Sequence, residues 1–512
     1  MKTMQNLGGK SMKPSTRGLR QQEIELKLAL PTTDPSSLSK RLSRLPLLAR
    51  RTPVHQTLHN VYYDTPQQIL RHKRIALRIR RVGSDASPQW LQTLKTGNRD
   101  DSALSRRGEW EAPVPSDTLA LNVLQATPWA TIDPDGTVFQ ALAPTFSTTF
   151  ERTSWTVRRR DGSVIEVALD IGVIVAGDKR APICELELEL LAGQPAALFH
   201  LARQIAATIA VLPANVSKAE RGYALAGEGP DMPLRAQPPK LAKQLLVSAA
   251  AGRVLREIFC HFTTNLNALH SSDDPEVVHQ ARVGWRRLKS ALRLFKPALA
   301  VNAAPSWQAL QPMLSFLGEL RDIDVARAET LPLLEDVYVA GNAQRAESWR
   351  AMTQSLLQEA KLQRKSVRYA LEDPAVGATL LAATQWLEEL SAIDGVEGAG
   401  ADVKVPLPRW SKRRLDRLHH KLKIARNDAD NPESLHRVRI LAKRLRYGID
   451  ALRTFLPKRR ANRWYRQATN LQRDLGVNRD GMQAGALLAK LDADRGLIEF
   501  VRGVAIGKAR QG

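Results

Sequence analysis

Charged and apolar residues alternate strictly near the start of the chain. Residues 21–28 read QQEIELKL, so a strand there would place Glu23, Glu25 and Lys27 on one face and an isoleucine and two leucines on the other. An ordinary half-buried strand alternates in the same way, with its charged face in water. The same charged alternation recurs four more times within the next 170 residues, which indicates a sheet whose charged face is more than a solvated surface.

The first part of the chain predicts an antiparallel sheet. Helices are expected over residues 35–48 and, at the end of this part, over 195–210 and 217–226. The dipeptide Asp161-Gly162 is a strong hairpin turn signal between two of the strands. The predicted strands cover residues 21–28, 61–66, 76–81, 89–95, 107–111, 154–158, 164–170 and 184–190.

The second part predicts helices, and it repeats itself. From Leu241 onward apolar residues recur at spacings of three and four, with few strand-like runs. Residues 278–289 align with 435–446 at an offset of 157, and residues 317–322 align with 475–480 at an offset of 158. Two matched pairs at nearly one offset indicate an internal duplication.

These patterns predict an α+β protein with separate sheet and helical domains. At 512 residues the chain is too long for one core. We expect a basic tail without fixed structure over residues 1–20 and a domain built on the sheet over 21–226. A Pro- and Gly-rich linker would follow over 227–240, and a helical domain over 241–512.

Charge narrows the class of partner. The net charge is +24, with 76 Lys and Arg against 52 Asp and Glu, and such an excess implies polyanions: nucleic acid, acidic lipid or polyphosphate. The 5% aromatic content is not interleaved with the basic runs, and no zinc-finger spacing occurs, which disfavours nucleic acid. No apolar stretch approaches a membrane span or a secretory signal, and Cys184 and Cys260 are few enough to suit the cytoplasm.

The charged positions of the predicted strands are grouped by sign. Carboxylates stand in pairs two residues apart, and so do cations. If the sheet curls with these faces inward, cations would bind phosphate oxygens and carboxylates would hold a hard divalent ion. A solvated sheet with cross-strand ion pairs explains the pattern equally well. The pairs are Glu23/Glu25, Glu109/Glu111, Glu185/Glu187 and Arg78/Arg80, with Lys27, Lys95 and Arg107 beside them.

Eight short motifs occur in order in this part: ExExK at 23–27, YYDTP at 62–66, LRIR at 77–80, TLK at 93–95, RxExE at 107–111, LDxG at 169–172, ExExE at 185–189 and SKAERGY at 217–223. This ordered set resembles the CYTH family, the triphosphate tunnel metalloenzymes. That family includes inorganic triphosphatases, thiamine triphosphatases and class IV adenylate cyclases. The resemblance implies an eight-stranded antiparallel barrel that forms a tunnel, and it favours the inward-facing alternative.

The resemblance also implies roles for individual residues. Divalent metal, Mg²⁺ or Mn²⁺, would be bound by Glu23, Glu25, Asp170, Glu185 and Glu187. The polyphosphate would be clamped by Arg78, Arg80, Lys95, Arg107 and Arg152, with Lys27 and Lys218 at its ends. The set expected to act directly in catalysis is Glu23, Glu25, Lys27, Arg78, Arg80, Lys95 and Arg107.

Some of these residues have plainer explanations. Arg152 suits a surface charge at the end of a strand, and Lys218 a charge at the start of a helix. Glu109 and Glu111 are as well placed to orient the cations as to bind metal. The expected mechanism needs no protein nucleophile, because the cations and one metal ion would neutralise the attacked phosphoryl group while a second ion activates water.

The duplicated helical segments carry one-sided positive charge. From Val278 to Pro297 there are six Lys and Arg and no Asp or Glu, whereas a solvated helix face normally mixes signs. A third basic helix is predicted over 410–426. This part is similar to the CHAD domain, a duplicated helical module whose histidines and basic residues bind polyphosphate. The implied contacts are His279, Arg282, Arg286, Arg287, Lys289, His436, Arg439, Lys443, Arg444 and Arg446.

The sequence therefore predicts a cytoplasmic inorganic triphosphatase that splits tripolyphosphate into pyrophosphate and phosphate. Its helical domain would hold long-chain polyphosphate, which would associate it with polyphosphate granules. Three alternatives remain open. They are a nucleoside or thiamine triphosphatase or class IV-type adenylate cyclase, a non-catalytic polyphosphate-binding protein, and a nucleic-acid-binding protein.

Overall fold

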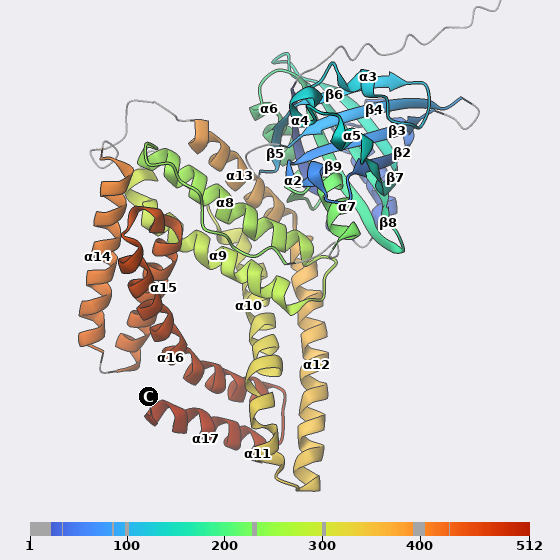
Figure 1. The fold of residues 1–512 in the computed structure, drawn as a ribbon. Helices are drawn as coiled ribbons and strands as arrows, with labels where there is room; N and C mark the ends of the chain where they lie inside the picture. Colours follow the sequence, from blue (N-terminus) through green and yellow to red (C-terminus); the bar gives the residue numbers. More distant parts are fainter. Residues whose placement is uncertain are drawn as a thin grey trace, which may run out of the picture.

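The structure is a computed structural model that describes residues 22–32, 34–83, 87–97, 102–227, 233–299, 304–392, 405–429 and 431–511. An antiparallel sheet with short helices forms the N-terminal region, and helices form the C-terminal region (Figure 1). The predicted α+β class is therefore confirmed. The expected basic tail over residues 1–20 lies outside the described residues.

Ten strands form one antiparallel sheet. Their order is β10-β1-β9-β8-β7-β2-β3-β4-β6, and β5 pairs with the first four residues of β1, on the edge opposite β9 that β10 also occupies. The strands are β1 (Glu23–Ala29), β2 (Val54–Asp64), β3 (Ile75–Val82), β4 (Gln89–Thr96), β5 (Leu104–Arg107), β6 (Glu109–Val114), β7 (Ala143–Arg158), β8 (Val164–Ala176), β9 (Lys179–Ala192) and β10 (Leu212–Pro213).

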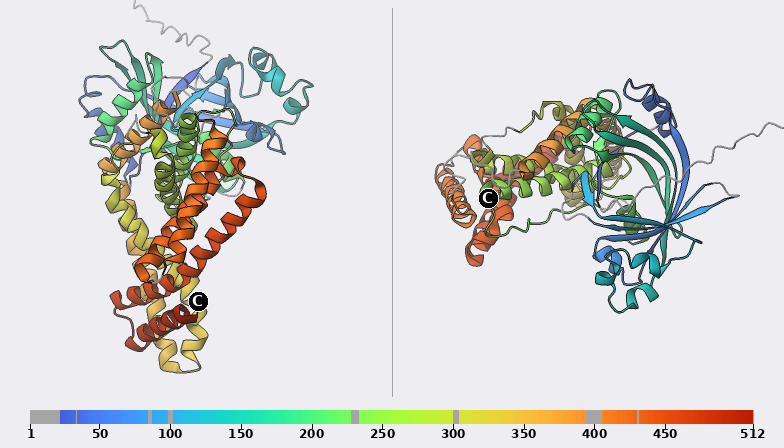
Figure 2. Two further views of the ribbon diagram at one scale, coloured as in Figure 1. Left: turned by 90° about the vertical axis from the view of Figure 1, so that its left-hand side faces the viewer. Right: turned by 90° about the horizontal axis from the view of Figure 1, so that it is seen from above.

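The sheet curls so strongly that one short segment joins its two ends. Strand β5 pairs with β1, with Arg107 opposite Glu23, and β6 pairs with β4, with Glu109 opposite Lys95. Only Gly108 separates β5 from β6, and a side chain there would overlap the ring of Trp110. The fifth predicted strand, at residues 107–111, is thus broken into two, and β10 is an additional strand. Figure 2 shows the curl from above.

Short helices cover the curled sheet. They are α1 (Leu38–Ser43), α2 (Ile69–His72), α3 (Leu121–Leu124), α4 (Trp129–Ile132), α5 (Thr137–Gln140), α6 (Ala196–Ala206) and α7 (Lys218–Ala226). Leu26 and Leu28 of β1 are fully buried in the core that α1 and α6 share with β8 and β9. The outer face of the sheet is therefore the apolar one, and the charged face is turned inward.

The C-terminal region consists of long helices packed around a core of its own. They are α8 (Val247–Ala268), α9 (Pro275–Phe295), α10 (Gln311–Val325), α11 (Glu335–Val339), α12 (Ala343–Leu371), α13 (Pro374–Ala392), α14 (Leu407–Asn427), α15 (Pro432–Leu452), α16 (Lys458–Lys490) and α17 (Arg495–Gln511). The duplicated segments fall on α9 and α15, which contact each other, and on α10 and α16, which also touch.

Helix α13 joins the two regions. It packs against α6 and β10 on one side and against α8 on the other. Gly377 lies so close to the carbonyl of Val211 that a side chain at this glycine would overlap it. Leu381 belongs to the core of the sheet region. Within the part of the chain that is described, none of the helices combines the length and the apolar composition that crossing a membrane requires.

Candidate active site

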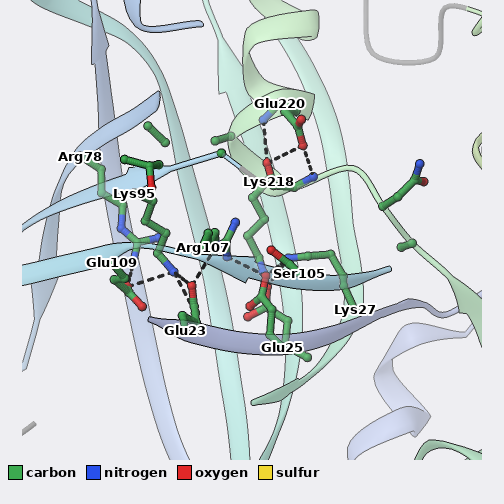
Figure 3. A pocket seen from close by; sticks show the side chains of 18 of the residues that line it. Glu23, Glu25, Lys27, Arg78, Lys95, Ser105, Arg107, Glu109, Lys218 and Glu220 are labelled. Atoms are coloured by element: carbon green, nitrogen blue, oxygen red, sulfur yellow. Dashed lines mark hydrogen bonds and ion pairs between the residues drawn. The ribbon is translucent and has the colours of Figure 1, made fainter. Parts of the chain in front are cut away.

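A cavity of about 350 Å³ lies inside the curled sheet (Figure 3). Its lining comes from strands β1 to β9, from α2 and from α7 with the segment that leads into it. Among the lining residues, nine Lys and Arg outnumber seven Glu. The nine cations are Lys27, Arg71, Arg74, Arg78, Arg80, Lys95, Arg107, Arg152 and Lys218.

Strand alternation places the charged side chains in this cavity. Glu23, Glu25 and Lys27 are buried yet line the cavity, because β1 has its leucines on the opposite, packed face. The pairing registers then set opposite charges across from each other. Lys27 stands opposite Glu187 of β9, and Glu23 stands opposite Arg107 of β5.

Three carboxylates converge beside the cavity, and Glu187 is the one that lines it. Oxygens of Asp170, Glu185 and Glu187 lie within 4.8 Å of one another. The Lys218 ammonium is 2.6 Å from Asp170 and 3.0 Å from Glu187, and it also pairs with Glu185. The Lys27 ammonium lies 2.6 Å from Glu187. Clustered carboxylate oxygens are hard ligands of the kind that Mg²⁺ and Mn²⁺ prefer, so these residues fit a divalent ion.

Two of these carboxylates, Asp170 and Glu187, remain ionised despite their burial. Burial alone would raise the pKa of Glu187, but Lys218, Lys27 and Arg152 hold that pKa well below its ordinary value. The pKa of Asp170 is also lowered, because Lys218 and Arg152 outweigh the effect of burial. Asp170 and Glu187 therefore keep their negative charge at neutral pH.

Glu23 and Glu25, also expected to bind metal, hold cations in this structure. The Arg107 guanidinium donates to Glu23 at 2.8 Å and to Glu25 at 2.6 Å. Both carboxylate oxygens of Glu23 accept from Lys95 at 3.0 Å. Glu25 also lies 3.5 Å from the ammonium of Lys27, which connects it to the three converging carboxylates.

Two neighbouring arginines form the most cationic end of the cavity. In Arg78, the Nε and Nη2 groups are buried without a hydrogen-bond partner, and Nη1 donates to the Tyr62 hydroxyl at 3.3 Å. The Arg80 Nε donates to Asn60 at 2.9 Å. Burial and the charge of Arg78 lower the pKa of Arg80 to about 10. Such an incompletely neutralised pair suits an anion with several oxygens.

Glu109 and Glu111 face these cations. Glu109 is 2.9 Å from Lys95 and 4.0 Å from Arg78, and Glu111 lies 3.8 Å from Arg80. The contacts match the orienting role that the sequence left open for both residues.

Arg152 and Lys218 are not surface charges. Arg152 donates through Nε and Nη2 to the carboxylate of Asp170, each at 2.7 Å, and through Nη2 to Glu187 at 2.6 Å. Lys218 is only 6% exposed. The surface-charge explanation for Arg152 is therefore wrong, whereas Lys218 does begin α7, with its ammonium paired to buried carboxylates. Both lie among the acidic ligands, so either can accompany a metal or a phosphate there.

Sequence reasoning missed two cations of the lining, Arg71 and Arg74. Asp64, which comes just before them in the chain, accepts hydrogen bonds from the backbone of Thr65, Leu70 and Arg71. It thereby fixes the turn from β2 into α2. The basic run RHKR at residues 71–74 could have predicted them. It directly follows a strand that ends near the cavity, so the helix after that strand lies near the cavity too.

The basic residues of the helical region occupy different environments. Lys289 and His436 are exposed, and Arg282, Arg286, Arg439, Lys443 and Arg444 are partly exposed. His279 is half-buried, and burial together with Arg321 and Arg286 lowers its pKa. Burial and Arg293 of α9 lower the pKa of Arg444 on α15, so positive charges of the two helices lie near each other. Arg446 packs over the ring of Tyr447.

Arg287 does not occupy its expected place. It is 6% exposed, and its guanidinium donates to the carbonyl of Gln237 at 3.1 Å. The physical reason is the helix period: Arg286 belongs to the outer stripe with His279 and Arg282, and the next residue is rotated by about 100° into the core. We therefore correct the prediction that Arg287 contacts polyphosphate.

Comparison with known proteins supports the division of the chain into an N-terminal sheet region and a C-terminal helical region. Residues 21–223 match the CYTH domain model, and residues 253–489 match the CHAD domain model. An inorganic triphosphatase of Haemophilus influenzae is 35% identical over 213 residues, which are 40% of this chain and 55% of that protein. The chain thus spans about half the length of this curated relative.

Two solved structures are also similar. The CHAD domain of the plant Ricinus communis is 28% identical with a TM-score of 0.45, covering 55% of this chain and 92% of that one. A putative adenylyl cyclase from Hippeastrum, described as having a dominant triphosphatase activity, is 19% identical with a TM-score of 0.27, covering 40% of this chain and 95% of that one. On the two domain matches, the chain consists of a CYTH domain followed by a CHAD domain.

Proposed function

We propose that this protein is a metal-dependent inorganic triphosphatase that hydrolyses tripolyphosphate to pyrophosphate and phosphate. One observation carries the proposal: carboxylates and cations face each other across one cavity, and the cations outnumber the carboxylates in its lining. A polyphosphate anion that brings divalent ions fits such a lining, because its oxygens suit the cations and its metal suits the carboxylates. The triphosphatase relative from Haemophilus influenzae supports the same reaction class.

Arg78 and Arg80 would bind one end of the substrate, because two buried N–H groups of Arg78 have no acceptor. Lys95 and Arg107 would exchange part of their contact with Glu23 for phosphate oxygens. Each such contact strengthens as negative charge spreads over the transferred phosphoryl group, which is how cations lower this barrier.

Asp170, Glu185 and Glu187 would hold the divalent ion, with Glu25 next to them and Glu23 beyond. When bound, the metal neutralises phosphate charge and lowers the pKa of a bound water. In this proposal the lining residues contribute binding and orientation, and water is the attacking group.

The burial of the aromatic rings in the cavity lining favours inorganic triphosphate over a nucleotide as the substrate. Tyr62, Phe150 and Tyr223 line the cavity, but each is at most 3% exposed and packs in a core cluster. Their rings are therefore already covered and offer no platform on which a base could stack.

For the helical region we propose polyphosphate binding, carried by the basic residues that α9 and α15 bring together, with Arg287 excluded. We place the protein in the cytoplasm, where Cys184 and Cys260, which are not joined in a disulfide, would stay reduced. Polyphosphate granules would then be within reach of the helical region.

The test is a phosphate-release panel with tripolyphosphate, pyrophosphate, ATP and thiamine triphosphate, each with Mg²⁺ and with Mn²⁺. We expect tripolyphosphate to be the best substrate and Glu187→Gln to lose at least about 100-fold in kcat/KM. Glu151→Gln is the matched control, since Glu151 lies next to Arg152 on β7 but is exposed and bonds to Thr57. Equal or faster turnover of ATP would refute the assignment of substrate, and full activity of Glu187→Gln would refute the metal site.

A further inference from the structure

A glutamate of the helical region binds the strand that closes the cavity. Glu388 of α13 accepts from the hydroxyl of Ser102 at 2.8 Å and from Arg106 at 3.0 Å. Arg256 of α8 lies 3.7 Å from the same carboxylate. The Glu388 side chain is only 10% exposed and that of Arg106 is 38% exposed, so the carboxylate is largely removed from water, which strengthens its charge-assisted hydrogen bonds.

Strand geometry connects this interface with the cavity. Arg106 and Arg107 are consecutive in β5, and successive side chains of a strand point to opposite faces. Arg107 therefore points inward to Glu23 and Glu25, while Arg106 points outward to Glu388. Because β5 has only four residues, holding Arg106 fixes the position of Arg107 to a large extent.

A second segment of the cavity rim is held in the same way. Asn215 lines the cavity three residues before Lys218. Its side chain accepts from Thr264 of α8 at 2.9 Å and also contacts Cys260. The backbone of Lys27 bonds to both held segments, donating to the carbonyl of Ala103 at 3.0 Å and accepting from the amide of Ala214 at 2.9 Å.

We propose that Glu388 is a positioning residue for the phosphate clamp: through Arg106 and β5 it sets where the guanidinium of Arg107 stands. The helical region is then a structural part of the cavity wall, in addition to any ligand it binds itself. The inference rests on the proposed function only in taking a triphosphate as the ligand of the cavity. The metal site stands apart from this contact, since Asp170, Glu185 and Glu187 come from β8 and β9.

The experiment compares Glu388→Gln with Glu389→Gln in the full chain. Glu389 is the next residue of α13, is exposed and accepts a hydrogen bond from Gln385 of the same helix, so Glu389→Gln makes the same charge change away from the contact with β5. Calorimetry would measure tripolyphosphate binding with metal chelated, so that no turnover occurs, and Mn²⁺ binding separately. We expect Glu388→Gln to weaken tripolyphosphate binding about threefold to tenfold, with Mn²⁺ binding and the Glu389→Gln variant within twofold of the wild type.

Arg106→Gln gives an independent measurement, because Arg106 lies outside the cavity. It should weaken tripolyphosphate binding as Glu388→Gln does. The double variant should bind tripolyphosphate as tightly as the weaker-binding single variant, since both substitutions act through one contact. Additive effects, unchanged binding, or an equal loss of Mn²⁺ binding would overturn the proposal. A wild type that binds tripolyphosphate without hydrolysing it would refute the triphosphatase activity and leave the positioning role to be decided by the same binding data.

Discussion

Replacing Lys218 by methionine should tighten metal binding and lower the stability of the folded protein. The Lys218 ammonium lies within hydrogen-bonding distance of three converging carboxylates, which is also where a divalent ion would bind. Lysine and metal therefore compete for the same oxygens. Methionine keeps most of the side-chain length and removes the charge, so that the metal no longer meets a fixed cation.

The magnitude follows from the distances. Two unit charges about 4 Å apart interact with about 4 kcal/mol at an effective dielectric constant of 20. The Lys218 chain can swing aside, and Lys27 remains at 2.6 Å from Glu187, so only part of this repulsion is relieved. We expect at least about 1.4 kcal/mol, a tenfold tighter Mn²⁺ dissociation constant. Without metal, three carboxylates lose a partner, and the free energy of unfolding should fall by about 3–5 kcal/mol.

Calorimetric titration with Mn²⁺ and thermal melts with and without the ion measure both effects. The melting temperature of Lys218→Met should start lower than that of the wild type and rise further when Mn²⁺ is added. Lys179→Met is the control, because Lys179 lies on the same strand as Glu185 but is exposed and bonds to the carbonyl of Gly227. Unchanged or weaker Mn²⁺ binding in Lys218→Met would refute the competition between lysine and metal.

Three further predictions concern pH, the clamp and the helical region. The pKa values of Asp170 and Glu187 are lowered from 3.8 and 4.5, so their stabilisation is present above those values and is lost as pH falls through the lowered pKa. Melting temperature should fall below about pH 4.5, less steeply in Glu187→Gln; an identical slope would contradict this. Arg78→Met should raise the KM for tripolyphosphate about tenfold, because two of its N–H groups have no hydrogen-bond partner until the ligand binds; an unchanged KM would exclude Arg78 from the clamp. Lys289→Met should weaken polyphosphate binding without changing the melting temperature, and Arg287→Met should do the reverse; a shared effect would mean that one surface includes both.

The arrangement of the sheet could be predicted because alternation is a local signal. Glu23, Glu25 and Lys27 share a face in any strand that includes them, and the leucines between them require a packed opposite face. Family motifs then ordered the strands. What they could not give was the break at Gly108, which depends on the ring of Trp110 lying across the chain. That contact exists only once the sheet has curled.

The partners of individual charges were less predictable, because a basic residue looks the same whether it faces solvent or the core. Arg287 belongs to a basic run, yet its partner is a linker carbonyl about fifty residues earlier. Glu388 lies in a helix with no motif of its own, and its partners come from β5 and α8. Such contacts are set by how two regions dock, and spacing along one helix contains no information about docking.

The pairing of charges within the cavity explains how it can be both stable and ready to bind. Without ligand, each buried carboxylate has a cation within reach, as Glu23 has Lys95 and Arg107, so no isolated buried charge has to be tolerated. A triphosphate with its metal brings both signs at once, so the cations and the carboxylates can each exchange one partner for another. A ligand of one sign alone would leave half of the lining unpaired. The cavity should therefore bind tripolyphosphate and divalent ion cooperatively, each tightening the other by the same factor, and Arg78, which has unbonded groups before any exchange, should be the first contact.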